Sequence, residues 1–254
     1  MDSQLSPASG RPALVVVAHG SRDPRALATV RALLDRVREL RPGLPVHLGH
    51  IELNAPLLPD TLAALGDREA VLVPLLLSRG YHVKQDIPEM AAAHPARTRV
   101  AAPLGPHPLL AATLHTRLTE AGWRPPRTAA ERRGSAVVLA AAGSRDPESA
   151  TDTGRTAALL AARLGVPVVP AYASAATPTV ASAVRSLRAR GRHRIAVASC
   201  FTAPGRFATE CAKAAPDIAS DPLGAHPLMA ELLLHRYDEA TTRVPTKPAL
   251  AAAP

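Results

Sequence analysis

The chain has 254 residues, 47% of them hydrophobic, and a formal net charge of +9, so it can bury a core and form one large or two small domains. Only 2% of the residues are aromatic, which leaves few rings to stack on bases and argues against a nucleic-acid partner. The sequence contains no apolar run of the roughly 18–20 residues that a membrane-spanning helix needs, and residues 1–12 lack the layout of a signal peptide.

The cysteines bear on the cellular compartment. Cys200 and Cys211 have a spacing that fits neither a zinc site nor an iron–sulfur cluster, and a single pair does not make a disulfide framework. We therefore expect a cytoplasmic protein with no membrane partner. Its positive charge favours an anionic ligand through long-range attraction.

Strands and helices are predicted to alternate through the first half. Residues 13–18 (ALVVVA) form a short apolar run before a glycine turn, as is typical of a buried strand. Residues 24–40 carry apolar side chains at helical spacing, and Asp23 can cap that helix. The further elements expected are strands at 44–51, 70–77 and 97–102, helices at 56–65, from about 87 and at 108–121, and a loop at 78–86.

The second half repeats this order. AHGSRDP at 18–24 returns as AAGSRDP at 141–147, and PLGPHPLLAATLHTR at 103–117 returns as PLGAHPLMAELLLHR at 222–236. Such self-similarity indicates a duplicated β–α unit. The predicted organisation is a disordered N-terminus at 1–12, a first domain at 13–122, a linker at 123–134, a second domain at 135–238 and a disordered tail at 239–254.

The order of the elements predicts the fold class. Strands that alternate with helices form parallel sheets, because each crossover returns the chain to the same edge. We expect an α/β protein with two similar domains, each a parallel four-stranded sheet flanked by helices. In such sheets, functional side chains gather in the loops after the carboxyl ends of the strands.

Three titratable residues follow strands of the first half. His19 comes after the first strand, Glu52 after the second and His82 after the third, so all three are expected on one rim. Two imidazoles and a carboxylate can bind a divalent first-row metal ion, and the histidines can also accept protons. Insertion of a metal ion into a nitrogen macrocycle needs both properties, because two pyrrole protons must leave.

Each of these residues also has an ordinary explanation, as a turn residue or a solvated end charge. The second copy favours the functional interpretation, because Ala142, Ser174 and the region of Arg206 and Phe207 occupy the corresponding positions. The duplicated backbone persists where the two imidazoles and the carboxylate are lost. This difference assigns the expected chemistry to the first half.

The same rim carries groups that suit a polycarboxylate. Gly20 and Ser21 precede a predicted helix whose free N–H groups attract anions, and arginines lie in the rim loops. The alternative is that these arginines are solvated surface charges, as most are. The candidates for substrate binding are Gly20, Ser21, Arg22, Arg79, Gly80 and Tyr81, with Lys84, Arg145 and Arg206 in the same loops.

The motifs AHGSRDP, HIELNAP, PLLLSRGYHVKQDIP and SCFTAPGRF resemble those of the sirohydrochlorin chelatases, part of the ATP-independent class II chelatase superfamily. The resemblance covers about residues 13–238 and includes the duplication. It implies two α/β domains with an active-site cleft between them, and as substrate sirohydrochlorin, a tetrapyrrole with eight carboxylates. It also implies that His19 and His82 bind the incoming metal ion and accept pyrrole protons, with Glu52 as a nearby acidic group.

The resemblance further implies a divalent metal substrate, Co²⁺ or Fe²⁺ with Ni²⁺ as another option, and no nucleotide. The sequence agrees in lacking Walker, dinucleotide-binding and nucleophile-elbow motifs. Imidazole and carboxylate ligands accept several divalent ions, so the siroheme and cobalamin pathways both stay open. A non-catalytic carrier of metal or tetrapyrrole is the alternative function, and either a monomer or a homodimer is compatible with the sequence.

Overall fold

The computed structural model describes residues 11–93 and 98–242. Of the two ends expected to be disordered, residues 1–10 and 243–254 lie outside the described residues. Residues 239–242 continue the last helix, so the expectation of disorder from residue 239 is wrong at that point. No helix in the described part of the chain is both long enough and apolar enough to cross a membrane.

Two parallel four-stranded sheets form the centre of the protein, which confirms the predicted α/β class. The strand orders are β2-β1-β3-β4 and β6-β5-β7-β8, so the two sheets have the same topology. Every residue of β1 and β5 is buried, as continuous apolar runs predict for central strands. The strands are β1 (Ala13–Ala18), β2 (Val46–His50), β3 (Ala70–Pro74), β4 (Thr98–Val100), β5 (Ser135–Ala141), β6 (Val168–Tyr172), β7 (Arg194–Ser199) and β8 (Ile218–Ala219).

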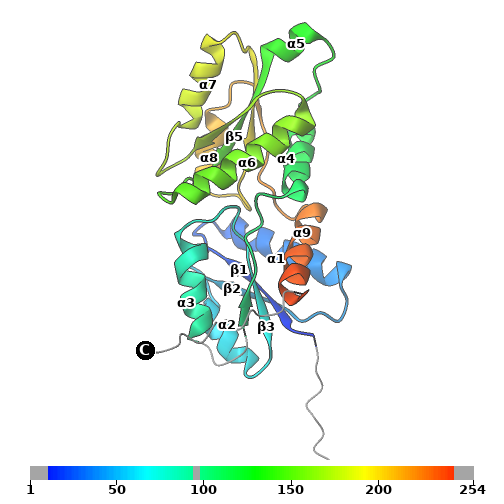
Figure 1. Ribbon diagram of the computed structural model, residues 1–254, viewed down its shortest axis with the longest axis vertical. Coiled ribbons are helices and arrows are strands. Elements are labelled where there is room, and N and C mark those ends of the chain that lie inside the picture. The colour runs from blue at the N-terminus through cyan, green and yellow to red at the C-terminus, as the bar shows by residue number, and fades with distance from the viewer. Residues whose placement is uncertain (1–10, 94–97, 243–254) are drawn as a thin grey trace, which may run out of the picture.

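Helices cover both faces of each sheet (Figure 1). Along β1, Leu14 and Val16 face one side of the sheet, while Val15 and Val17 pack with Leu58 on the other side. The helices are α1 (Pro24–Leu40), α2 (Leu58–Leu65), the π-helical turn η1 (His82–Asp86), α3 (Ile87–Ala92), α4 (Pro108–Glu120), α5 (Ala129–Gly134), α6 (Pro147–Leu164), α7 (Val180–Ala189), α8 (Arg206–Lys213) and α9 (Pro227–Thr242).

The closing helices of the two halves are exchanged. Helix α4, which ends the first half of the sequence, packs on α6 and β7, whereas α9, which ends the second, packs on α1 and β3 (Figure 1). Arg41 at the end of α1 forms an ion pair with Asp238 of α9. Arg117 of α4 donates a 2.9 Å hydrogen bond to the carbonyl oxygen of Leu223. The halves are therefore joined by packing as well as by their linker.

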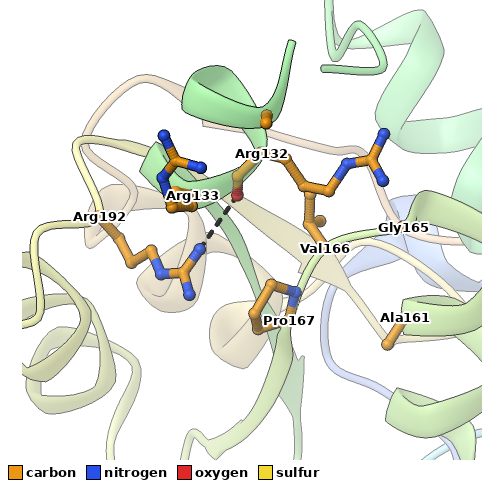
Figure 2. Close-up of a pocket in the computed structure, with 8 residues that line it drawn as sticks. Arg132, Arg133, Ala161, Gly165, Val166, Pro167 and Arg192 are labelled. Atoms are coloured by element: carbon orange, nitrogen blue, oxygen red, sulfur yellow. Dashed lines mark hydrogen bonds between the residues drawn. The ribbon is translucent and has the colours of Figure 1, made fainter. Parts of the chain in front are cut away.

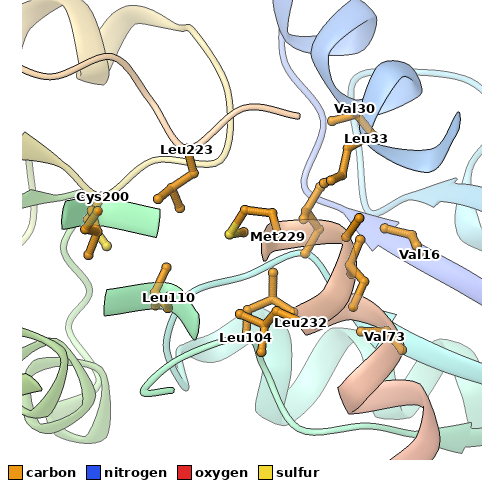
Figure 3. Close-up of a cluster of buried hydrophobic side chains, with 14 of the residues drawn as sticks. Val16, Val30, Leu33, Val73, Leu104, Leu110, Cys200, Leu223, Met229 and Leu232 are labelled. Carbon is orange, nitrogen blue, oxygen red and sulfur yellow. The ribbon is translucent and has the colours of Figure 1, made fainter. Parts of the chain in front are cut away.

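One apolar core runs through both halves. Leu104 and Leu110 from the first half and Leu223 and Met229 from the second are fully buried and belong to the same cluster (Figure 3). The cluster continues into the inner faces of both sheets. Because hydrophobic stabilisation follows the apolar area removed from water, this shared burial links the stability of one half to that of the other.

Two segments expected to lack regular structure contain helices. Residues 82–86 of the predicted loop form η1, and Pro88, just beyond it, has no N–H to donate to a regular α-helical turn. The linker 123–134 contains α5, where Thr128 accepts a 3.1 Å hydrogen bond from the Glu131 N–H. Glu131 in turn accepts from the Thr128 N–H, which completes a capping box. The sequence T-A-A-E at 128–131 has the pattern of a capping box, and this pattern predicts the start of a helix within the linker.

Candidate active site

The structure brings the three predicted residues together. His19 follows β1, Glu52 follows β2 and His82 begins η1 after β3. The centroids of the two imidazole rings lie 4.7 Å apart, with the ring planes at 86°. Nδ1 of His19 lies 3.6 Å from Oε1 of Glu52. All three side chains are partly exposed, 42% for His19, 52% for Glu52 and 36% for His82, so they meet at a surface open to solvent.

The backbone around Gly20 brings the first two loops into contact. Gly20 has φ +103°, and a Cβ there would overlap the carbonyl oxygen of Glu52. The Glu52 N–H donates to the His19 carbonyl at 3.1 Å. The Ser21 N–H donates to Oδ1 of Asn54 at 2.7 Å. Gly20 is therefore needed for close approach, and the Ser21 amide, which we expected to bind a substrate anion, already has a partner.

Asp86 is a site residue that the sequence analysis missed. Its Oδ2 lies 2.5 Å from Nδ1 of His82, across one turn of helix. Since an ionised carboxylate only accepts hydrogen bonds, Nδ1 carries the proton and Nε2 of a neutral His82 keeps its lone pair. The spacing of the two residues, i and i+4, would have shown the pair once a helix was assigned there.

Arg79 is not the free anion donor that the sequence analysis expected. Its backbone N–H and Nε donate to Oδ2 of Asp152 at 3.0 and 2.9 Å, and its Nη2 donates to Oδ1 at 2.7 Å. Nη1 lies 3.5 Å from Glu148. Burial alone would raise the pKa of Asp152, but the hydrogen bonds from Arg79 outweigh it and hold that pKa below its usual range. A guanidinium so engaged ties the first half to α6.

Lys84 makes a second tie to α6. Its ammonium lies 2.8 Å from Oδ2 of Asp146 and 2.9 Å from Oε2 of Glu148. The hydrogen bonds to these two carboxylates raise the pKa of Lys84, and Lys84 in turn lowers the pKa of Asp146. Lys84 therefore stays cationic at neutral pH.

The other substrate-binding candidates flank the histidines. Tyr81 is 65% exposed, and its ring centroid lies 6.3 Å from that of His82. Leu53, next to Glu52, is 50% exposed. These side chains offer apolar surface beside the imidazoles, where a flat macrocycle can pack. Gly80 lies against Ser144 of the second half, and Arg22 is exposed.

Three other histidines have structural partners. His50 is 2% exposed, and its Nδ1 lies 3.1 Å from the carbonyl oxygen of Pro56. Burial lowers the pKa of His50 and favours its neutral form. His107 and His226 each accept a hydrogen bond from the N–H two residues further on, at 3.1 and 3.2 Å. They cap the starts of α4 and α9, as the matched turns of the two copies require.

The donor set at the rim is small. Among the described residues there is no group of three or more His, Cys, Asp or Glu side chains arranged to hold a metal ion. Two adjacent imidazoles are therefore the strongest ligands that the rim offers, with Glu52 more loosely placed. Two nitrogens fill only half of a tetrahedral shell, so an ion here would keep positions open to another ligand.

A pocket of about 600 Å³ lies elsewhere, between α5, the end of α6 and the start of β6 (Figure 2). Its lining includes Arg132, Arg133 and Arg192, and Nη1 of Arg192 donates to the Arg132 carbonyl at 3.0 Å. None of the predicted site residues lines this pocket. It is therefore not the cleft expected between the halves, which stays a prediction.

Comparison with known families agrees with the duplicated plan. The sequence model of the CbiX family matches residues 13–121 and matches again at 136–240. The chain belongs to the CbiX family. Both halves carry the family pattern, although only the first keeps the histidines of the rim.

Curated proteins related to this CbiX chain include the sirohydrochlorin cobaltochelatases of Methanococcus aeolicus and Methanopyrus kandleri. The first is 35% identical over 81 residues, which is 31% of this chain and 57% of the relative. The second is 35% identical over 86 residues, or 33% and 60% of the two lengths. The chain thus spans less than two thirds of the length of these relatives.

Solved structures similar to this CbiX-family chain include SirB from Bacillus subtilis with Fe³⁺. Its TM-score is 0.72 at 23% identity, covering 91% of this chain and 95% of that chain. The sirohydrochlorin chelatase SirB from Bacillus subtilis subspecies spizizenii in complex with cobalt gives 0.69 at 20% identity, covering 90% and 94%. At these identities the likeness shows a shared two-lobed fold.

Proposed function

We propose that this chain is a chelatase that inserts a divalent metal ion into sirohydrochlorin. The observation that carries the proposal is the pair of imidazoles, 4.7 Å apart, on an accessible rim of a CbiX fold. The similar proteins are named sirohydrochlorin cobaltochelatases, and the similar structures are described with iron or cobalt. We therefore propose Co²⁺ as the first metal to test, with Fe²⁺ second.

The two histidines would hold the metal ion before transfer. Asp86 holds the proton on Nδ1 of His82, so Nε2 would be the nitrogen that binds the ion. A partly filled ligand shell suits an ion that is passed on, since closed shells are typical of structural sites. The pyrrole nitrogens of the substrate would complete the shell and then replace the histidines.

Metal transfer and proton removal are coupled by the lone pairs. One imidazole nitrogen uses the same lone pair to bind a metal ion or a proton, so a histidine accepts a pyrrole proton only after its bond to the metal breaks. The macrocycle gains a 2+ ion and loses two protons, so its net charge is conserved. Glu52, 3.6 Å from His19, would receive a proton from that ring and release it to water.

The surroundings support a macrocyclic, anionic substrate. Tyr81 and Leu53 present apolar surface beside the histidines, and the chain carries a net charge of +9. We propose that Gly20, Ser21, Arg22, Gly80 and Tyr81 line the tetrapyrrole site, without Arg79, whose guanidinium is bound to Asp152. One chain supplies both lobes. The free cysteines Cys200 and Cys211 fit a reducing cytoplasm.

The test is anaerobic metallation of sirohydrochlorin with Co²⁺, Fe²⁺ and Ni²⁺ in parallel, followed by absorption with and without protein. We expect acceleration over the spontaneous rate, and loss of that acceleration in the double variant His19→Ala, His82→Ala with an unchanged melting temperature. Binding of the tetrapyrrole without acceleration would instead make the chain a carrier. A double variant that metallates at the wild-type rate would refute the roles of both histidines.

A further inference from the structure

The second copy of the rim turn and the start of α6, residues 143–152, contact the segment that carries His82. Oγ of Ser78 lies 2.9 Å from Oγ of Ser149. Arg79 binds Asp152 through three hydrogen bonds. Lys84 binds Asp146 and Glu148. The second half, which lacks the rim histidines, thus binds the loop of the first half on both sides of His82.

Asp152 is the anchor of this contact. Its side chain is 0% exposed, so its charge depends on Arg79 for compensation. The pairing is bidentate, and the backbone N–H of Arg79 adds a further bond, so Asp152 fixes main chain as well as side chain. Arg79 lies three residues before His82, and Lys84 lies two residues after it.

The two copies have diverged in a complementary way. Aligning the AGSRDP turn with HGSRDP places Arg25, Ala26 and Thr29 opposite Glu148, Ser149 and Asp152. Aligning Gly205 with Gly80 places Pro204 opposite Arg79 and Thr209 opposite Lys84.

Arg79 and Lys84 therefore have no basic counterpart in the second copy, and Glu148 and Asp152 have no acidic counterpart in the first. Asp146 does have one, Asp23, which pairs with Arg25 of its own half instead of with the other half. A packing contact inherited from the duplication would leave the same partners in both halves. The difference fits a second copy that has lost its own site and now supports the first.

We propose that the second copy acts as a positioning platform, in which Asp152, with Asp146 and Glu148, holds the 78–84 segment so that His82 stays beside His19. Arg79 and Asp152 are positioning residues, since neither touches the reacting atoms. This inference rests on the proposed function for its catalytic meaning. Its structural content, the order of residues 78–86, is measurable without any substrate.

The main variant is Asp152→Asn, which keeps the shape of the side chain and removes its charge. We expect faster amide hydrogen exchange in peptides from 78–86, Co²⁺ affinity lowered about tenfold, as for loss of an outer partner of a metal ligand, and a lower kcat with little change in KM for the tetrapyrrole. Co²⁺ affinity is measured on the full chain with the metal alone, from its absorption bands.

Two milder variants allow the same test if Asp152→Asn does not fold. Arg79→Lys keeps the positive charge but loses the bidentate hydrogen bonds to Asp152. Lys84→Gln removes the ion pairs with Asp146 and Glu148. Both side chains are partly exposed. We expect each to weaken Co²⁺ binding by a few-fold, in the same direction as Asp152→Asn.

The matched control is Arg41→Gln. Arg41 also forms an ion pair between the halves, with Asp238, at the end of α1 away from the histidines. We expect this variant to have a lower melting temperature but to keep the Co²⁺ affinity of the wild type and its rate of amide hydrogen exchange at 78–86. If Arg41→Gln lowers Co²⁺ affinity as much as Asp152→Asn, the effect is general destabilisation and the platform is refuted.

The outcomes separate this inference from the proposed function. Wild-type exchange at 78–86, or wild-type Co²⁺ affinity, in folded Asp152→Asn would overturn the platform even if the wild-type chain is an active chelatase. A wild-type chain that binds Co²⁺ but does not metallate sirohydrochlorin would overturn the chelatase proposal, while a positioning effect on Co²⁺ affinity in Asp152→Asn would still support the platform.

Discussion

The rim turns of the two halves share a backbone conformation and the sequence GSRDP, but His19 precedes the glycine in the first and Ala142 in the second. Gly20 and Gly143 have φ of +103° and +91°, and each lies against a carbonyl oxygen of the loop after the neighbouring strand, that of Glu52 or Ser174. The N–H of Glu52 donates to His19 at 3.1 Å, and the N–H of Ser174 donates to Ala142 at 3.0 Å.

The site histidines and carboxylates of the first half have been replaced in the second. His19 corresponds to Ala142, and the hydrogen-bonded pair of His82 and Asp86 corresponds to Phe207 and Cys211. The backbone of the turn is the same in both halves, because the same hydrogen bonds and the same close approach of a glycine to a carbonyl oxygen hold it in each. The two histidines and the two carboxylates of the candidate active site occur only in the first half, so the two halves can be tested against each other.

The largest effect on stability is expected in the apolar core, to which both halves contribute equivalent helices. Leu110→Ala on α4 and Met229→Ala on α9 each remove a fully buried side chain from the shared core. Each should lower the free energy of unfolding by about 2–5 kcal/mol. Denaturant unfolding monitored by circular dichroism should show one transition in both variants. Two separate transitions would mean that the halves are independent after all.

Adding a methyl group to either rim glycine should give the next largest effect. Gly20→Ala and Gly143→Ala both place a Cβ at positive φ and 1.9 Å from a carbonyl oxygen, so each should lose at least about 1–3 kcal/mol of stability, the cost of the backbone strain alone. Only Gly20→Ala should also slow metallation, measured well below the melting temperature, because only its loop carries His19 and Glu52. Equal slowing in both variants would remove the functional difference between the turns.

Lowering the pH should destabilise the contact made by Asp152, and the equivalent position in the first half has no such dependence on pH. The folded pKa of Asp152 is lowered, so its ionised form stabilises the folded state at neutral pH, and that stability is lost as pH falls below the usual carboxyl value of 3.8. Thr29, at the equivalent position, has no such charge. Thermal melts between pH 7 and 3 should show a smaller loss in Asp152→Asn than in wild type, and an equal loss would contradict this.

Asp86 provides a smaller and more local test. Asp86→Ala removes the acceptor that holds His82 Nδ1 at 2.5 Å, and should lower Co²⁺ affinity about tenfold or more with little change in melting temperature. Its counterpart Cys211 is buried, and burial raises its pKa to about 11, so it is a neutral thiol. Cys211→Ala should therefore leave Co²⁺ affinity unchanged when titrated in the same way.

The smallest expected effect is that of restoring one histidine to the second copy. Ala142→His should not create a second site, because Phe207 and Ser174 stand where a second imidazole and a carboxylate would be needed. Calorimetric titration with Co²⁺ should give the same stoichiometry as wild type. A second equivalent of bound Co²⁺ would mean that the turn alone defines the site.

Much of the fold was predictable, because it depends on local patterns. Apolar runs identified β1 and β5 as central strands, and the helix predicted at residues 24–40 ends where α1 ends. The expected rim also follows from topology, since parallel strands bring their carboxyl ends to one edge. His19, Glu52 and His82 come together for that reason.

The remaining features depend on contacts between distant residues. Arg79 and Asp152 are 73 residues apart, and nothing in the local pattern of either one identifies its partner. The exchange of α4 and α9 was equally hidden, because the two helices follow nearly identical motifs and either could close either sheet. Asp86 was missed for a simpler reason, since a loop was expected where η1 lies.

The crossed placement of α4 and α9 has a consequence for how a protein of this plan can be divided. If the chain were cut near residue 125, each fragment would lack the helix that covers its own sheet. It would carry instead the helix that packs on the sheet of the other fragment. A polypeptide with a single repeat would be in the same situation and would have to trade its last helix with a second molecule to become whole. Gene fusion turns that trade into an internal one, which leaves one of the former subunits free to lose its reactive groups.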